Sequence, residues 1–442
     1  MISSSVIASY RRQFLEHTAR WSVREPAWLS LLRREAFERF LDRGFPTTND
    51  EDWRFTSVAP LAAMEFSLGR GREEALQLSS PLGDVWERYE MVFVNGHFTP
   101  EHSGVGTLPG GIVLESFATA LESHPDELEA VLTLNPAEGA TVFADLNRAF
   151  LGDGAFVMVP EGVVLEKPIH IVHVSSSATG VSEAAEQRPV VSHPHLIVLA
   201  ERGAHLRLVE SYVSFGGNPR FTNAAAEIVA AGGANVDHYR IQTENESAFH
   251  VGSQRLLQAE GAVIQDHSVS LGGRFARLDI HSLLDGHGAD LTLNGLYVVK
   301  GTQHVDHHTV IDHRKPHGTS RELYKGVLDG EASGVFNGRI IVRPGAQKTN
   351  AQQTNKNLLL SEGALVNTNP QLEIEADDVK CAHGATIGQL DKDALFYLRS
   401  RGIGPEEATG ILTRGFIADL SDRIRIPAVR EAVRRYVFAE AA

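Results

Sequence analysis

Hydrophobic and polar positions change their spacing twice along the 442 residues of the chain. From Ser5 to Arg43, apolar residues recur at three- and four-residue steps, which predicts amphipathic helices. From about Met91 the chain consists of short aliphatic and β-branched runs separated by glycine, which predicts strands. After Gly388 this strand pattern stops. We therefore expect an N-terminal helical region over 1–90, a β core over 91–388 and a C-terminal helical region over 389–442.

The C-terminal region carries clear helix boundary signals. Asp391 is a good N-cap for a helix over Lys392–Ser400, and Gly402 is placed to end that helix. Pro405 and Pro427 suit the first turns of two further helices. The third of these is expected to end near Phe438.

A Gly-Ala pair recurs through the β core and predicts its architecture. The pairs begin at Gly203, Gly233, Gly261, Gly288, Gly345, Gly363 and Gly384. The first four follow one another at nearly equal steps, and a near-constant period of this kind is typical of a solenoid. We therefore predict a parallel β-helix in a mainly β protein, in preference to a β-sandwich, whose loops vary in length. The closer spacing of the last three pairs predicts a change of cross-section there, and Asn337-Gly338 predicts a hairpin turn.

Composition and charge exclude several classes of partner. With 42% hydrophobic and 22% charged residues, the chain has the composition of a globular protein. Its net charge of −15 argues against nucleic acid and anionic membranes as partners, because both require a basic surface. One cysteine cannot form an internal disulfide, and neither a spanning apolar run nor an apolar leader segment is visible. The expected location is the cytoplasm.

Cys381 and His383 are the first candidate site. If their segment is a strand, both side chains leave the same face, because strand side chains alternate. A thiolate and an imidazole on one face could bind one metal ion, although two ligands do not complete a site. The alternative is that Cys381 is a small apolar core residue.

Histidines also gather near the middle of the β core, interleaved with aspartates. The set comprises His304, Asp306, His307, His308, Asp312, His313 and His317. Imidazole and carboxylate suit zinc, iron or manganese, but in a strand His304, Asp306 and His308 would share one face and His307 the other. The plainer interpretation is a polar face of the solenoid.

Other polar segments suggest structure more than catalysis. Glu322, Tyr324 and Lys325 are acid and base types without a supporting geometry, and the run Gln352–Asn357 fits a hydrogen-bonded ladder of stacked amides. The chain has neither a phosphate-binding Gly-Lys-Ser/Thr loop nor a Gly-x-Ser-x-Gly elbow. Nucleotide hydrolysis, if involved, must therefore come from another chain.

Five sets of motifs, in order along most of the chain, carry a resemblance to a known family. They are Asn49–Thr56, His304–His308, Ser320–Gly326, Gln352–Leu360, and Cys381–Thr386 followed by Leu395–Gly402. As a set they resemble the SufB/SufD family of iron–sulfur cluster assembly scaffolds. SufB-type members carry a cysteine in the strand that matches Thr354–Asn357, and its absence here places the resemblance on the SufD side.

The resemblance implies a right-handed parallel β-helix with helical ends, in a complex of one SufB, one SufD and two copies of the ATPase SufC. It implies that a SufB-like paralogue pairs with Gly345–Gly388 and that a SufC-like ATPase binds Asp391–Phe438. A transient iron–sulfur cluster would form at the junction, with ligands from both chains. His383 is the main candidate ligand and Cys381 the second. The expected interface residues are Gln352, Asn355, Asn357, His383, Phe396 and Arg399.

The sequence thus predicts a non-enzymatic scaffold subunit with no nucleotide site of its own. Two other classes stay open. A β-helix carbohydrate-active enzyme would need convergent carboxylates in an open cleft, and a purely structural repeat protein would bind no ATPase. In isolation, a homodimer formed through the sheet edges is also plausible.

Overall fold

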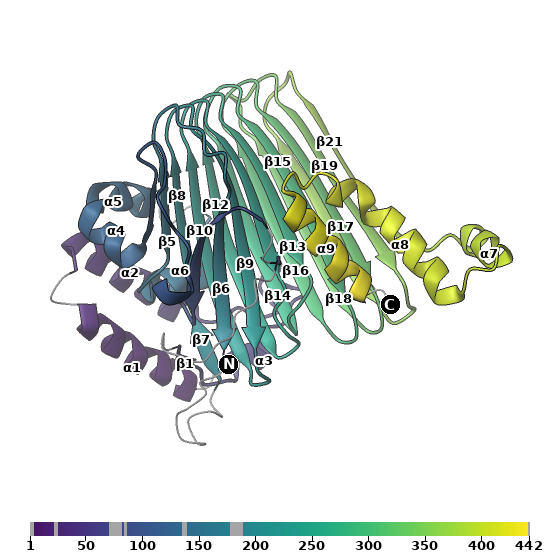
Figure 1. Ribbon diagram of the computed structural model, residues 1–442, viewed down its shortest axis with the longest axis horizontal. Helices are drawn as coiled ribbons and strands as arrows, with labels where there is room; N and C mark the ends of the chain where they lie inside the picture. The colour runs from purple at the N-terminus through teal and green to yellow at the C-terminus, as the bar shows by residue number, and fades with distance from the viewer. Residues whose placement is uncertain are drawn as a thin grey trace.

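The chain forms a long coil of two facing sheets with helices at both ends (Figure 1). The computed structural model describes residues 4–21, 25–69, 82–83, 86–134, 139–176 and 189–440. Residues 70–81, which fall in the expected N-terminal helical region, lie outside the described residues.

Successive strands alternate between two sheets, so that each turn of the coil adds one strand to each. The first sheet runs in the order β20 (Leu365–Ile374), β18 (Ser333–Val342), β16 (His304–His313), β14 (Phe275–Leu284), β12 (Ala248–Gln258), β10 (Arg220–Ala230), β8 (His195–Ala200), β5 (Ala155–Val159) and β4 (Val113–Ser116), with β7 (Val190–Ser192) and β1 (Ser67–Leu68) alongside. The second runs β21 (Lys380–Gln389), β19 (Asn350–Leu359), β17 (Thr319–Leu328), β15 (Asp290–Val299), β13 (Val263–Ser270), β11 (Asn235–Gln242), β9 (His205–Phe215), β6 (Ile169–Ser176), β2 (Tyr89–Val94) and β3 (His97–Phe98). Neighbouring strands of the coil pair in parallel, which confirms the parallel β-helix and excludes the β-sandwich.

The period of the coil matches the Gly-Ala spacing. Asn235 pairs with Val263 and Val263 with Asp290, so successive turns there are of nearly equal length. Gly233, Gly261 and Gly288 stand two positions before these strands with φ of 69°, 64° and 69°. This left-handed conformation suits glycine, which has no Cβ to clash.

The predicted change of cross-section is wrong. Thr319 pairs with Asn350 and Asn350 with Lys380, so the last turns are no shorter than the earlier ones. Gly363 precedes β20 of the other sheet, and Gly384 lies inside β21. The positive-φ corners of the last turns are instead taken by His317 and Lys348, at φ of 61° and 64°.

The predicted hairpin at Asn337-Gly338 is also wrong, because β18 runs through it as one strand. Gly338 instead allows a side chain to approach the backbone closely inside the coil. A Cβ at this position would clash with Nε2 of Gln353, so the glycine leaves room for that amide. A glycine inside a strand often marks such a close approach.

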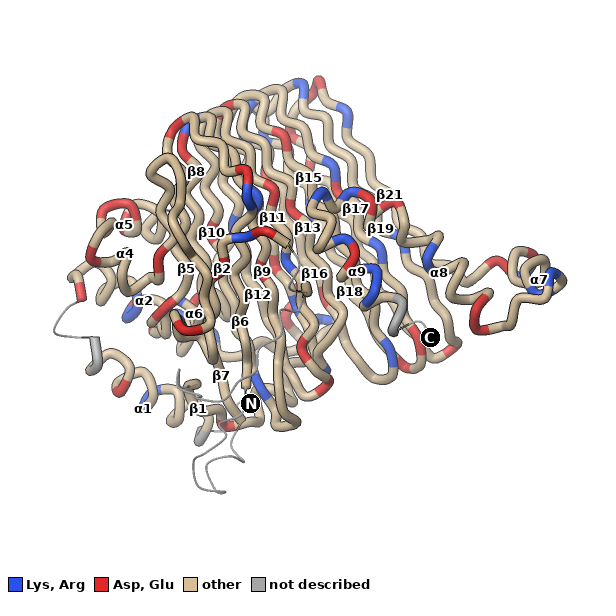
Figure 2. Tube along the Cα trace, viewed as in Figure 1, with Lys and Arg blue, Asp and Glu red and all other residues tan. Residues whose placement is uncertain are grey.

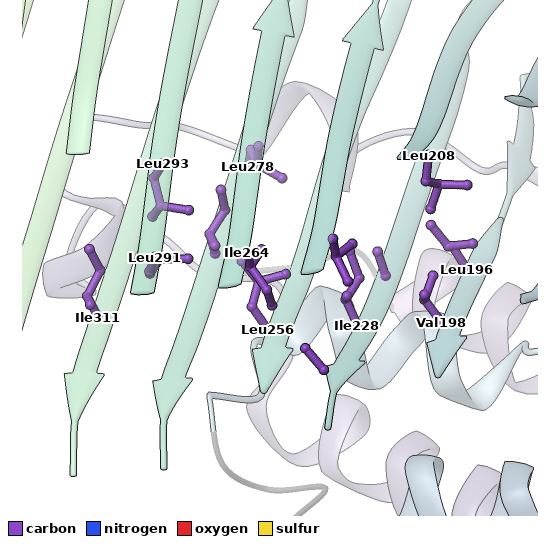
Figure 3. Close-up of a cluster of buried hydrophobic side chains, with 14 of the residues drawn as sticks. Leu196, Val198, Leu208, Ile228, Leu256, Ile264, Leu278, Leu291, Leu293 and Ile311 are labelled. Carbon is purple, nitrogen blue, oxygen red and sulfur yellow. The ribbon is translucent and has the colours of Figure 1, made fainter. Parts of the chain in front are cut away.

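Apolar side chains stack rung on rung between the sheets (Figure 3). Val198, Ile228, Leu256 and Leu291 are fully buried in this cluster. Burying each such side chain contributes about 1.5–3 kcal/mol, so the stacked rungs are the main source of stability for the coil.

Helices cover the first turns of the coil. They are α1 (Ser4–Trp21), α2 (Ala27–Arg43), a 3₁₀ turn (Glu51–Trp53), α3 (Ala59–Ala62), a 3₁₀ turn (Pro100–His102), α4 (Phe117–Ser123), α5 (Pro125–Thr133) and α6 (Val142–Ala149). The helices α4 to α6 therefore lie within the range 91–388, between β4 and β5. Tyr10, Phe40 and Phe150 form an aromatic cluster that joins α1 and α2 to the end of α6.

The C-terminal helices begin where the sequence predicts. They are α7 (Lys392–Ser400), α8 (Pro405–Ser421) and α9 (Pro427–Glu440). The Asp391 side chain caps α7 by accepting from the backbone N–H of Asp393 at 2.8 Å. Ile417 and Val433 pack with Tyr239 and Leu296 of the outer sheet face, whereas α7 has no buried residue and projects beyond the coil (Figure 1). Within the described ranges, none of the helices combines the length and apolar character required to span a membrane.

Candidate functional site

The C-terminal end of the coil is open, and β21 is its edge strand. This strand pairs with β19 on one side only, and nearly all of its side chains are exposed. Lys380 is its single charged residue, and Figure 2 shows the strand almost free of charge. In the other sheet, the edge strand β20 contains Pro370, which has no backbone N–H to donate to a further strand. An uncharged edge without proline is open to pairing with a further strand.

Cys381 and His383 face the inside of the coil from this edge. Register partners in a parallel sheet share a face, and the partners of these two residues, Ala351 and Gln353, are buried. The side-chain face predicted for the pair is thus present. His383 is exposed because no rung covers it, while Cys381 is half-buried against the apolar core.

Burial raises the pKa of the Cys381 thiol, so the isolated chain disfavours the thiolate that binds metal. His383, by contrast, is freely accessible from solvent. Of the two predicted ligands, the imidazole is therefore the one better prepared to receive a metal ion at the open end.

The predicted amide residues of β19 divide between two faces. Gln352 is exposed. Asn355 and Asn357 are buried one rung inside the open end, where Asn357 donates to Asn355 at 2.6 Å and accepts from the hydroxyl of Tyr297. The predicted ladder of stacked amides is therefore wrong, because the residues paired with this run on β17 and β21 carry no amide side chains. The two buried amides instead bond to each other and to a tyrosine two turns below.

The predicted residues of α7 lie on the exposed surface. Phe396 is 73% and its neighbour Tyr397 57% exposed, the two largest exposures of aromatic side chains in the described structure. Arg399 is exposed as well, and Arg401 lies 5.1 Å from the ring centre of Tyr397. These residues form an apolar surface bordered by arginine.

The histidine cluster does not converge on one point. His304 and Asp306 face outward on β16, while His307 faces the interior beside Tyr297 and Tyr324, where burial lowers its pKa to about 3. His313 is buried against Ser320, and His317 forms a corner. Among the described residues, no group of three or more His, Cys, Asp or Glu has the geometry to hold a metal ion.

Instead, the outward residues of β16 attach the N-terminal loop to the coil. Asp306 accepts from Thr56 at 2.6 Å and pairs with Arg277 at 2.6 Å. The Arg277 guanidinium lies 3.7 Å from the ring centre of Trp53 and donates to the carbonyl of Asp52 at 2.8 Å. We call Trp53, Thr56, Arg277 and Asp306 the N-terminal clasp. Two motifs that lie far apart in the sequence are therefore one structural unit.

The acid and base types of β17 face opposite sides of the strand. Lys325 points outward, where it binds Asp419 and the carbonyl of Phe416, both at 2.6 Å, and so holds α8 on the coil. Glu322 points inward and is fully buried, so burial raises its pKa to about 7 although Gln353 donates a hydrogen bond to it. The two residues cannot act together on one substrate.

Charged groups inside the coil are the part of the structure that sequence reasoning missed. His238 lies between Glu210 and Asp266, at 3.0 and 2.6 Å, on three successive rungs. Burial lowers its pKa, but hydrogen bonds to both carboxylates outweigh burial and raise it to about 9. The only available signal was the recurrence, once per turn, of polar residues at alternate strand positions. A single sequence does not show whether such residues face the inside of the coil or its outer surface.

Comparison with known proteins places the chain in a family. Residues 4–171 match the family described as SufBD protein N-terminal region, and residues 181–416 match SUF system FeS cluster assembly, SufBD core domain. The chain is 32% identical over 434 residues to an iron–sulfur cluster assembly SufBD family protein of Synechocystis, covering 96% of this chain and 94% of the relative.

Two further relatives are named as SufD proteins. The iron–sulfur cluster assembly protein SufD of Escherichia coli is 32% identical over 400 residues, 90% of each chain, and that of Bacillus subtilis is 27% identical over 452 residues, 97% of this chain and 96% of the relative. The two matched regions, the coil they form and these identities agree. The chain therefore belongs to the SufB/SufD family of the SUF system for iron–sulfur cluster assembly.

Proposed function

We propose that this chain is a non-enzymatic scaffold subunit on which an iron–sulfur cluster, as cargo, is assembled in the cytoplasm. It pairs with a SufB-type paralogue through the open end of the coil and binds a SufC-type ATPase through the C-terminal helices. The single observation that carries this proposal is β21, an exposed, almost uncharged edge strand that presents Cys381 and His383 beside each other.

An edge strand with free N–H and C=O groups supports pairing with a strand of another chain. Strand addition at β21 would extend the sheet and place the partner's side chains in the rung above His383. The remaining ligands of the cluster would then come from the partner, because this chain supplies only two. In isolation, a second copy of the chain could occupy the same edge and give a homodimer.

Hydrolysis of ATP by the bound ATPase would shift the relative populations of two arrangements of the paired coils. The scaffold then needs contacts that differ between the two arrangements, and no catalytic groups of its own. The exposed pair Phe396 and Tyr397 on α7 and the packing of α8 against β17 support this route. One end of the helical region would contact the ATPase, and the other is fixed to the coil at β17.

The carbohydrate-active alternative finds less support. Two carboxylates that line the groove between the N-terminal loop and the coil are already paired with arginine. Glu227 lies 3.0 Å from both Arg148 and Arg255, and Asp279 lies 2.7 Å from Arg277. Carboxylates held in this way are poor general acids, because the ion pair stabilises the ionised form.

Replacing His383 by alanine tests the ligand role. In the reconstituted complex with SufB-type and SufC-type partners, we expect the yield of assembled cluster, measured by iron and sulfide content, to fall at least about tenfold. Imidazole binds iron in its neutral form, so the wild-type yield should also fall at acidic pH. His205→Ala, an exposed histidine on β9 at the other end of the coil, is the matched control. An unchanged yield for His383→Ala would refute the ligand role.

A second experiment tests ATPase binding. Truncation of all C-terminal helices would uncover the apolar outer face beneath α8 and α9, so a milder change is needed. We expect Phe396→Ser with Tyr397→Ser to abolish co-purification of the SufC-type ATPase without a change in melting temperature, because α7 buries no residue. Leu15→Ser, 68% exposed on α1, serves as the control. Retained binding by the double variant would place the ATPase elsewhere.

A further inference from the structure

Gln353 is held in a fixed orientation directly beneath the open end of the coil. Its side chain faces inward from β19 and is 1% exposed. Its Nε2 donates to Oε2 of Glu322 on β17 at 2.7 Å. On the opposite sheet, the missing side chain of Gly338 provides the space that this Nε2 fills. The hydrogen bond to Glu322 and the space beside Gly338 together fix the orientation of the side-chain amide, with Nε2 toward Glu322.

The amide oxygen of Gln353 is left without a partner. Oε1 is buried and accepts no hydrogen bond from any described residue. A buried acceptor that remains unpaired is unfavourable, because it loses its hydrogen bonds to water without replacement. Such an atom near the end of a coil indicates a donor that arrives when that end is covered.

His383 is the residue placed to supply that donor. It is the register partner of Gln353 and stands on the same inward face one rung above, at the spacing of adjacent strands. A metal-binding imidazole nearly always donates its second ring N–H to an oxygen acceptor, which fixes the tautomer and orients the ring. Among the described residues, Gln353 offers an unused oxygen next to this histidine.

We propose that Gln353, anchored by Glu322, is a positioning residue that accepts the ring N–H of His383 when a partner covers the open end. The amide then leaves the other ring nitrogen free to bind iron. This inference rests on the proposed function, because it needs both the partner and the ligand role of His383. It assigns a task to a buried polar pair that the assembly reaction does not otherwise use.

The test uses the complex of the full chain with its SufB-type partner and Co²⁺ as the metal probe. Binding is titrated by the ligand-field absorption of Co²⁺, which reports affinity and ligand geometry without cluster assembly. We expect Gln353→Met, which keeps the length of the side chain but removes the acceptor, to weaken Co²⁺ binding about 10- to 100-fold. Exchanging the two residues, Gln353→Glu with Glu322→Gln, keeps one amide donor between the two positions and an oxygen acceptor beneath His383, and should return the affinity to within a few-fold of wild type. His383→Ala should abolish the histidine contribution to the spectrum.

The outcomes separate the two levels of the proposal. If His383→Ala weakens binding but Gln353→Met does not, the positioning role is wrong and the ligand role of His383 stands. If the exchange of Gln353 and Glu322 is as defective as Gln353→Met, Gln353 is only structural and the inference is overturned. If His383→Ala binds Co²⁺ as wild type, both proposals fail. Should Gln353→Met not fold, Glu322→Met releases the anchor instead, and unchanged Co²⁺ affinity in that variant would also overturn the inference.

Discussion

Replacing Arg277 by methionine should lower the free energy of unfolding by about 3–5 kcal/mol. The substitution leaves the Asp306 carboxylate, whose side chain is fully buried, without its principal counter-charge. His308, 3.1 Å away, and the Thr56 hydroxyl are too weak to replace a guanidinium. The same change removes the cation that lies over Trp53.

Thermal unfolding and hydrogen exchange measure this effect. We expect a lower melting temperature and faster exchange in residues 47–58, which the N-terminal clasp attaches to the coil. Arg321→Met is the matched control, because Arg321 pairs with Asp290 at 3.0 Å and both side chains remain in contact with solvent. Arg321→Met should lower the free energy of unfolding by less than about 1 kcal/mol. Adding Asp306→Asn to Arg277→Met should recover part of the stability, and equal losses for the two arginine variants would show that the clasp carries no buried-charge penalty.

Local signals predicted the order and type of elements well. The Gly-Ala corners of Gly203, Gly233, Gly261 and Gly288 each stand directly before a strand, and the Asp391 cap begins α7 as expected. These features depend on backbone conformation within a few residues, which sequence determines directly. The family assignment rested on several such motifs together.

The failures came where residues far apart in sequence decide the outcome. Gly384 has the sequence of a corner but lies inside an edge strand, and Gly338 has the sequence of a turn but makes room for Gln353. His317 and Lys348 adopt corner conformations that usually belong to glycine because the rungs on either side fix the register. Pattern within a short window cannot detect a constraint imposed from the adjacent turn.

The candidate site shows the same division. The shared face of Cys381 and His383 followed from strand alternation alone. Whether that face points into or out of the coil could be decided only from the burial of Ala351 and Gln353, one rung earlier in the sheet. The clasp between the motifs at 49–56 and 304–308 depends on contacts between distant parts of the chain, so neither motif alone could indicate the other as its neighbour.

Stability should also depend on pH through Glu322, and Glu322→Gln should remove this dependence. The folded pKa of about 7 lies above the ordinary value of 4.5 because the carboxyl is buried. Below pH 4.5 the group is protonated in the folded and unfolded chains, and its contribution to stability is fully present. As the pH rises toward 7, the unfolded chain releases the proton while the folded chain retains it, so stability falls by about 1.4 kcal/mol for each unit of pKa difference.

Glutamine keeps the carbonyl oxygen that accepts from Gln353 but has no proton to release. We therefore expect Glu322→Gln to match wild type at pH 4 and to exceed it at pH 8 by about 3 kcal/mol, measured as the difference between urea unfolding curves at the two pH values. Glu373→Gln provides a control of opposite sign, because the hydrogen bond and charge of Arg339 lower the pKa of Glu373. Glu373→Gln should therefore lower the free energy of unfolding slightly at high pH. Parallel pH profiles for Glu322→Gln and wild type would mean that Glu322 is already ionised in the folded coil, with water or a cation reaching it through the open end beside His383.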